Sequence, residues 1–427
     1  MKKTNILFDF IRPWFLILLL YAGIAPANAM LIQEDTSQAY TEYKGSVVDN
    51  RGDGIPSVYL EVEGSNISTI TNSEGSFSLK LPDDLEGVSV KISSMGYQTA
   101  LLPLEYFKNQ ETKITLEETA MVLSEVALFT AEDPQELVRK MLDKRGENYF
   151  NELTEMTAFY RESIKKRRRN VSLSEAVVKI HKQPYTSIGR DNVSIVKARK
   201  SADYERLDTL VLKLRGGPFN TLNIDVMKNP DFLLDSETLD SYKFSFQDPQ
   251  RINDRYLYVV DFEEYDQSKP WYYGSLFIDA ESLTLVKADF DLNVDDRNVA
   301  SRWFVKKKPG GTKVYPVSVH YTVDYRERDG KWYYGYGKAE LDFVINWRRK
   351  LFNTRYTVNS EMAITHWEKA GQDLPRRSPD YISQRIVMSD DISGFADSAF
   401  WGANNIIEPD KSIENAIEKI QERLSIQ

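Results

Sequence analysis

The 427-residue chain contains no cysteine. This absence excludes disulfide bonds, thiolate metal sites and a cysteine nucleophile. It also excludes the lipid anchor of bacterial lipoproteins, which is attached to a cysteine. Histidine is scarce too, and His181, His320 and His366 lie too far apart in the sequence to form a metal-binding motif. We therefore expect a protein without a metal ion or another cofactor.

Long apolar runs are also scarce, and the one near the start of the chain stands alone. Lys2 and Lys3 precede the apolar run 14–20, and the small residues Ala27 and Ala29 follow it. This order is that of a secretory signal peptide with cleavage after Ala29. The run is shorter than the roughly 20 apolar residues that a spanning helix needs. The sequence thus predicts an exported chain that has no transmembrane segment after cleavage.

Basic residues are outnumbered, with 55 Lys and Arg against 64 Asp and Glu and a formal net charge of −9. An acidic chain repels phosphate backbones, so we expect no nucleic-acid partner. One local exception is a run of five basic residues: Lys165, Lys166, Arg167, Arg168 and Arg169. The run falls between two predicted strands, where a solvated hairpin tip is the simplest explanation. The alternative is contact with an anionic surface such as lipid head groups or lipid A phosphates.

Motifs that carry catalysis are lacking as well. A glycosidase needs two carboxylates that face each other across a cleft. The adjacent carboxylates at 83–84, 263–264, 295–296 and 390–391 do not meet this need, because neighbours in a strand point to opposite faces. The Gly-rich segment 215–218 lacks the Lys-Ser/Thr of a phosphate-binding loop. We therefore predict a protein that is not an enzyme.

The chain is rich in β-strand patterns. Between residues 42 and 118, short runs of Val, Ile and Thr alternate with turns of Gly, Pro and Asn, as in a small antiparallel sandwich. Tyr59 and Glu61 alternate with apolar neighbours and should point outward. The expected core residues occupy the other positions of these strands: Val58, Leu60, Val62, Phe77, Leu79, Val90 and Ile92.

The turns of this segment resemble those of a known family. Thr71–Phe77 and the pair Gly96-Tyr97 are similar to motifs of the carboxypeptidase-like regulatory domain, a transthyretin-like sandwich. Asn72 stands where the family usually has aspartate, and asparagine makes the same local backbone bonds. The resemblance implies an interaction module facing the periplasm at the outer membrane of Bacteroidota. It does not imply peptidase activity, because the zinc ligands of carboxypeptidases belong to another domain.

A second unit follows a connector. Asp133 and Pro134 predict the start of a helix over 134–145, and Gly146 predicts its end. Beyond residue 155 the pattern is almost wholly β, with long strands in sequence order. Such strands predict a large, curved antiparallel sheet.

Parts of this second unit also resemble known proteins. The segment Trp271–Asp279, followed by 285–290, is similar to a hairpin of periplasmic lipoprotein-carrier-like half-barrels. Ser174–Ile180 and the helix at 134–145 are similar to an uncharacterised Bacteroidota family that joins the regulatory domain to such a module. A concave aromatic face in a half-barrel either packs as core or holds an acyl chain or a glycan. Both interpretations stay open.

The last part of the chain has two segments. The Pro- and Gly-containing stretch 371–404 should be a loop, with Phe400 and Trp401 docking into the fold. From Ile413 to Leu424, apolar residues recur at helical spacing. This spacing predicts an amphipathic C-terminal helix that packs on the sheet.

The expected fold is mainly β, with a transthyretin-like β-sandwich followed by a large curved antiparallel sheet, half-barrel-like, and a few helices. The segments are a signal peptide 1–29, a linker 30–41, the sandwich 42–118, a connector 119–131, the β-rich domain 132–370, a loop region 371–404 and the C-terminal helix 405–427. These features favour an exported adaptor, associated with the outer membrane, that binds a periplasmic or outer-membrane protein. The alternative is a periplasmic carrier of lipid or another apolar ligand, and a glycan hydrolase is the weakest candidate.

Overall fold

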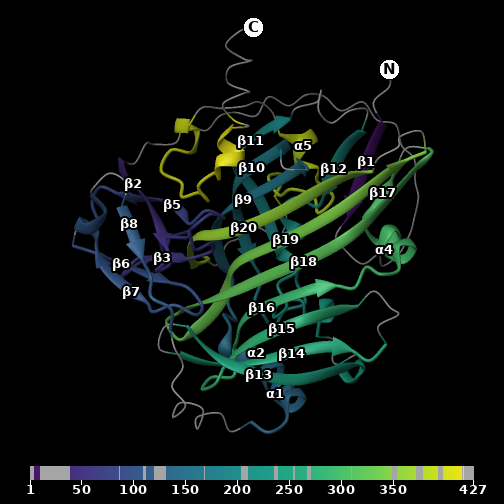
Figure 1. The fold of residues 1–427 in the computed structure, drawn as a ribbon. Helices are drawn as coiled ribbons and strands as arrows, with labels where there is room; N and C mark the ends of the chain where they lie inside the picture. Colours follow the sequence, from purple (N-terminus) through teal and green to yellow (C-terminus); the bar gives the residue numbers. More distant parts are fainter. Residues whose placement is uncertain are drawn as a thin grey trace.

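The protein is mainly β (Figure 1). The computed structural model describes residues 4–9, 39–85, 87–108, 112–119, 131–167, 169–202, 210–234, 239–252, 255–266, 271–308, 310–348, 353–371, 378–392, 398–415 and 417. The strands in this part of the chain form four sheets. A strand expected within the connector, at 122–129, lies outside the described residues.

Two small sheets form the predicted sandwich. Their strands are β2 (Tyr40–Val48), β5 (Ser76–Pro82) and β8 (Thr112–Thr115) in the order β5-β2-β8, and β3 (Tyr59–Val62), β4 (Ser68–Ile70), β6 (Ser89–Ser93) and β7 (Ala100–Pro103) in the order β4-β3-β6-β7. Every expected core residue of the sandwich is buried. The short helix η1 (Leu104–Lys108) adds Phe107, whose ring meets the edge of Phe77 at 6.2 Å between centroids. The alternation of apolar and polar residues along the strands therefore predicted the inner face of the sandwich correctly.

A single large antiparallel sheet dominates the second unit, as expected. Its strands are β9 (Thr154–Lys166), β10 (Arg169–Lys182), β11 (Asn192–Ala202), β13 (Tyr242–Ile252), β14 (Arg255–Glu264), β15 (Tyr272–Asp279), β16 (Leu285–Leu292), β18 (Thr312–Arg328), β19 (Lys331–Trp347) and β20 (Thr354–Lys369). They lie in the order β11-β10-β9-β20-β19-β18-β16-β15-β14-β13. The last strand, β20, therefore pairs with the first, β9.

The inner face of this sheet is filled by the chain's own side chains. Residues 216–234, which follow β12 (Leu210–Arg215), lie against it and include α3 (Phe219–Leu222) and η3 (Pro230–Phe232). A buried cation secures this segment, since Lys182 Nζ lies 2.7 Å from Asp225 Oδ2 and 2.8 Å from Asp191 Oδ2. The aromatic inner face therefore packs as core in the described part of the chain.

The predicted first helix is present, but it ends differently. α1 (Pro134–Asp143) is capped by Asp133, whose carboxylate accepts from the backbone N–H of Gln135 at 2.9 Å. Gly146 does not end it, because it lies inside a second short helix, α2 (Arg145–Asn148). Tertiary packing continues the helical path here, since Tyr149 directly after α2 is buried and its hydroxyl donates to Leu285 O at 2.6 Å.

A third small sheet contains the start of the chain. β1 (Thr4–Asp9) lies between β12, to which it is parallel, and β17 (Val305–Lys307), to which it is antiparallel. α4 (Arg297–Phe304) leads into β17. β1 belongs to the predicted signal peptide, and residues 10–29 are outside the described residues. Cleavage after Ala29 stays a prediction, and it would remove the central strand of this sheet.

The C-terminal part departs from the expected helix over 405–427. Residues 405–410 are not helical, and the helix begins at 411. The sandwich holds this stretch in place, because the Asn405 side chain bonds to both backbone groups of Lys80 in β5. The expected loop region contains α5 (Met388–Asp391) and η5 (Ser398–Trp401). Among the described helices, none has the length and apolar character needed to cross a membrane.

Candidate binding cleft

The sandwich is docked on the outer face of the large sheet. Tyr59 points out of the sandwich, as its position in β3 predicts, yet it is only 8% exposed. Its ring packs in a cluster with Tyr336 and Ala363 of the large sheet. Its hydroxyl donates to Asp324 Oδ2 at 3.1 Å, and burial raises the pKa of Tyr59 well above its usual value. The outward face of β3 is therefore an interface between the two units.

Arg326 of β18 forms a polar link in this interface. Its guanidinium lies over the Tyr59 ring at 4.6 Å from the centroid and donates through Nε to Glu61 Oε1 at 3.0 Å. A further bond runs from Nη1 to Ser68 Oγ at 2.8 Å. Although burial opposes ionisation, the charges of Arg326 and Lys91 keep the pKa of Glu61 below its usual value.

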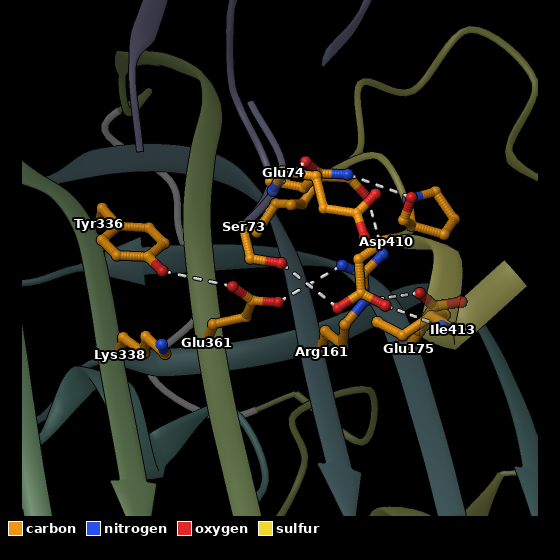
Figure 2. Close-up of polar contacts among 12 residues, drawn as sticks. Ser73, Glu74, Arg161, Glu175, Tyr336, Lys338, Glu361, Asp410 and Ile413 are labelled. Carbon is orange, nitrogen blue, oxygen red and sulfur yellow. Dashed lines mark hydrogen bonds and ion pairs between the residues drawn. The ribbon is translucent and has the colours of Figure 1, made fainter. Parts of the chain in front are cut away.

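A second buried cluster surrounds Arg161, close to Ser73 and Glu74 of the sandwich (Figure 2). Arg161 of β9 donates from Nε to Glu175 Oε1 at 2.8 Å, and its Nη1 lies 3.4 Å from Glu361 Oε1. Arg199 donates to the other oxygen of Glu175 at 2.7 Å. Burial alone would raise the pKa of Glu175, but the two arginines hold it below its usual value. The cluster therefore stays charged inside the protein.

The C-terminal stretch completes this interface. Ile407 O accepts from Arg161 Nη2 at 2.7 Å. Trp401 packs edge-on against the Phe159 ring at 5.4 Å between centroids, and the Arg199 guanidinium lies 5.0 Å from the centroid of its ring. Trp401 is buried, as its sequence context predicted. Residues 398–415 thus hold the sandwich and the sheet together.

A cleft of about 650 Å³ opens where the sandwich and the sheet diverge. The sandwich contributes Lys91 and Ser93 of β6, besides Tyr59 and Glu61 of β3. The larger unit contributes the opposite wall: Ile252, Arg255, Tyr256, Asp279, Ala280, Glu281, Val286, Tyr325, Arg326, Glu327 and Trp332. Aromatic rings and charges of both signs therefore line one space.

Arg255 organises the charges of that wall. Its Nη1 lies 3.2 Å from Asp279 Oδ2, its Nη2 pairs with Glu327, and its guanidinium lies 5.4 Å from the centroid of the Trp332 ring. Burial would lower the pKa of Arg255, but the charges of Glu327 and Asp279 raise it above its usual value. Both carboxylates are thus engaged in ion pairs with the same guanidinium.

The five basic residues singled out in the sequence lie elsewhere, at the β9–β10 hairpin tip. Lys165 Nζ is 3.6 Å from Asp410 Oδ2. Arg167 is exposed with φ +58°, and Arg169 is exposed as well. Arg168 is outside the described residues, and Lys166 is half-buried in β9. The hairpin is confirmed, and contact with an anionic surface stays a prediction.

The adjacent carboxylates take separate roles. Asp296 caps α4 by accepting from the backbone of Asn298 at 2.9 Å, and Asp390 pairs with Lys213 at 2.6 Å. Glu263 and Glu264 line a smaller cleft of about 410 Å³. Within the described ranges, no group of three or more histidines or carboxylates is placed to hold a metal ion.

The large cleft could not be predicted from the sequence. Its walls come from strands that lie far apart in the chain, and only the outward position of Tyr59 and Glu61 hinted at an interface. Tyr256 lines the cleft from the start of β14 and is half-buried there.

Comparison with protein families supports the sandwich. Residues 43–128 match the family model of the CarboxypepD_reg-like domain. The domain expected from the turns of the sequence is therefore present, and the affiliation with Bacteroidota stays a prediction. No curated protein sequence matches this chain.

Several solved structures show remote likeness to the chain. A putative outer membrane lipoprotein-sorting protein domain from Vibrio parahaemolyticus is 12% identical, with 58% of this chain and 96% of that chain covered and a TM-score of 0.24. The MucA/MucB complex of Pseudomonas aeruginosa gives 12% identity, 53% and 93% coverage and a TM-score of 0.18. A LolA superfamily protein from Nitrosomonas europaea is 11% identical, with 56% of this chain and 94% of that chain covered and a TM-score of 0.18. Likenesses this remote say nothing of function.

Proposed function

We propose that this protein is exported and acts, without catalysis, as an adaptor that binds a protein partner in the cleft between the sandwich and the large sheet. The observation that carries the proposal is the buried interface behind the cleft. Arg326 bonds to Glu61 of the sandwich, and Arg161 bonds to Ile407 of the C-terminal stretch, which the sandwich holds through Asn405. Both walls of the cleft therefore have a fixed geometry. A preformed cleft loses little conformational entropy when it binds a partner.

The lining suits a segment of polypeptide. Lys91 on one wall and Glu281 on the other present opposite charges, and Tyr256 presents an aromatic ring between polar neighbours. A polypeptide supplies side chains of both charges and apolar groups together, which matches such a mixed surface.

Two observations favour an adaptor over the alternatives. The carboxylates Asp279 and Glu327 are both paired with Arg255, so they are not arranged as the two carboxylates that face each other across a substrate in a glycan hydrolase. The inner face of the sheet is packed with residues such as Phe219 and Met227, where a lipid carrier would hold its ligand. Mass spectrometry of the intact protein under native conditions tests this choice, because a stoichiometric lipid would support the carrier and refute the adaptor.

Export is tested by cell fractionation and N-terminal sequencing. The signal-like order of Lys2, the apolar run and Ala29 predicts a periplasmic or outer-membrane protein that begins at Met30. An uncleaved protein found only in the cytoplasm would refute this location.

Binding is tested with photo-crosslinking residues at positions 91 and 281, on opposite walls. We expect both positions to link to the same protein, and position 108 on η1 outside the cleft to give no such product. The double variant Lys91→Glu/Glu281→Ser should lose the complex, and Lys108→Glu should keep it. A complex that survives the double variant would place the partner elsewhere.

A further inference from the structure

Three turns of the chain meet at one end of the large sheet. They are the β9–β10 turn, the β19–β20 connection and the β17–β18 connection. Strand register brings them together, because Lys166 pairs with Tyr356, Thr354 with Ile345 and Trp347 with Thr312. Figure 1 shows β18 and β19 running to the same upper corner, where β17 lies.

Each of these turns exposes basic side chains. The six exposed residues, here named the basic rim, are Arg167, Arg169, Lys308, Lys313, Arg348 and Arg355. Backbone bonds join the turns to their neighbours, since Arg167 N donates to Arg355 O at 3.1 Å and Arg348 N donates to Gly311 O at 3.1 Å. The charges therefore sit on a connected framework and not on separate loops.

The positive charge of the basic rim is opposite in sign to the net charge of the whole chain. The chain carries a formal net charge of −9, yet no ion pair joins a rim residue to another residue in the described ranges. The neighbouring Asp410 is 13% exposed at its side chain and is paired with Lys165. The positive field of the rim is therefore left for an external partner.

We propose that the basic rim docks the protein on an anionic lipid surface. The turns span five adjacent strands, which at about 4.8 Å per strand cover roughly 20 Å. A row of this width along the end of a sheet matches a plane of head groups better than one small anion. Attraction at the rim and repulsion from the acidic remainder would orient the protein on the surface.

Vesicle sedimentation tests the proposal with the full chain. We expect binding to vesicles that contain phosphatidylglycerol, weakening as salt rises, and little binding to vesicles of phosphatidylcholine alone. The variant Arg169→Gln/Arg348→Gln/Arg355→Gln should lose about a hundredfold in partitioning, since each basic residue contributes about fivefold near such a surface. Arg167 is left unchanged because its φ of +58° disfavours most side chains.

The matched control removes three exposed lysines from other parts of the molecule, Lys108→Gln/Lys113→Gln/Lys140→Gln. This control changes the net charge by the same amount as the rim variant, and it should partition onto vesicles as the wild type does. If both variants lost partitioning equally, net charge alone would explain the binding, and the proposed role of the basic rim would be refuted.

Other results would also overturn the proposal. Equal binding to both kinds of vesicle would point to an apolar contact. Saturable binding of inorganic phosphate in calorimetry, with no preference for vesicles, would indicate a site for a single anion. Binding of duplex DNA with equal strength would identify a general polyanion surface.

Discussion

Arg161 and Glu175 face each other across β9 and β10 as a buried ion pair, with 2.8 Å between Nε and Oε1 and side chains 3% and 0% exposed. Arg161 also binds Ile407 O and approaches Glu361, so one guanidinium joins two strands of the sheet and the C-terminal stretch. The pair therefore secures the interface that supports the cleft.

Removing Glu175 and removing Arg161 should lower the free energy of unfolding by different amounts. Glu175→Leu leaves Arg161 and Arg199 buried without their shared carboxylate and should cost about 3–5 kcal/mol. Arg161→Met should cost less, because Glu175 keeps Arg199 at 2.7 Å. Urea unfolding measures both. The exposed pair Lys243–Glu263 supplies the control, where Glu263→Gln should change stability by less than about 1 kcal/mol. Equal costs for Glu175→Leu and Arg161→Met would contradict the shared role of Glu175.

Glu162 should make stability depend on pH. Burial raises the pKa of Glu162 from 4.5 to about 8, where it accepts from the Tyr160 hydroxyl at 2.8 Å. The folded state then keeps a proton that the unfolded state loses, so stability falls as pH rises between these values, by on the order of 1.4 kcal/mol per pH unit.

Glu162→Gln removes the titration and keeps an acceptor for Tyr160. We expect this variant to be clearly more stable than the wild type at pH 8 and close to it at pH 4.5, by thermal unfolding. The exposed Glu263→Gln should show no such difference between the two pH values. A wild-type advantage at pH 8 would contradict the buried neutral carboxyl.

Asn405 should control how firmly the C-terminal stretch holds the sandwich. It accepts from Lys80 N at 2.7 Å and donates to Lys80 O at 3.0 Å. Asn405→Ala leaves both backbone groups without this partner and should cost about 1–3 kcal/mol. Hydrogen exchange at Lys80 and along 405–410 should accelerate. Asn404→Ala is the control, because its side chain bonds only to Trp401 O within its own turn, and it should leave Lys80 protected.

Gly75 should be essential to the sandwich turn. Its φ is +79°, and a Cβ at this position would approach Val47 O to 2.4 Å. Gly75→Ala should therefore cost more than the roughly 1–2 kcal/mol of the left-handed backbone alone. Gly64 is the matched control, with φ +73° and open space around it. If Gly64→Ala and Gly75→Ala destabilised equally in urea, the close approach to Val47 would be disproved.

Local patterns were sufficient for much of this protein. The alternation of Val58, Leu60 and Val62 placed the inner face of the sandwich, and Asp133 marked the start of α1. Period-two alternation reports burial along a strand without knowledge of its partners. A capping carboxylate acts within one turn of its helix. Such features depend on neighbours in the chain, so the sequence alone predicts them.

The interface could not be predicted in this way. Tyr59 is outward from the sandwich and yet buried, because it meets Asp324, which lies 265 residues further along the chain. The stretch 405–410 is not helical, and its Asn405 is held by Lys80, which lies 325 residues away in the chain. Gly146 lies inside α2 because Tyr149 is held by Leu285.

The sequence by itself therefore determined the two β units, their inner faces and the absence of cysteine chemistry. The tertiary structure decided which outward faces meet, and so created the cleft beside Arg255 and gathered the basic rim around Arg355. The physical reason is that each of these sites is formed by strands distant in sequence, whose outward residues carry no periodic signal of the partner they will contact.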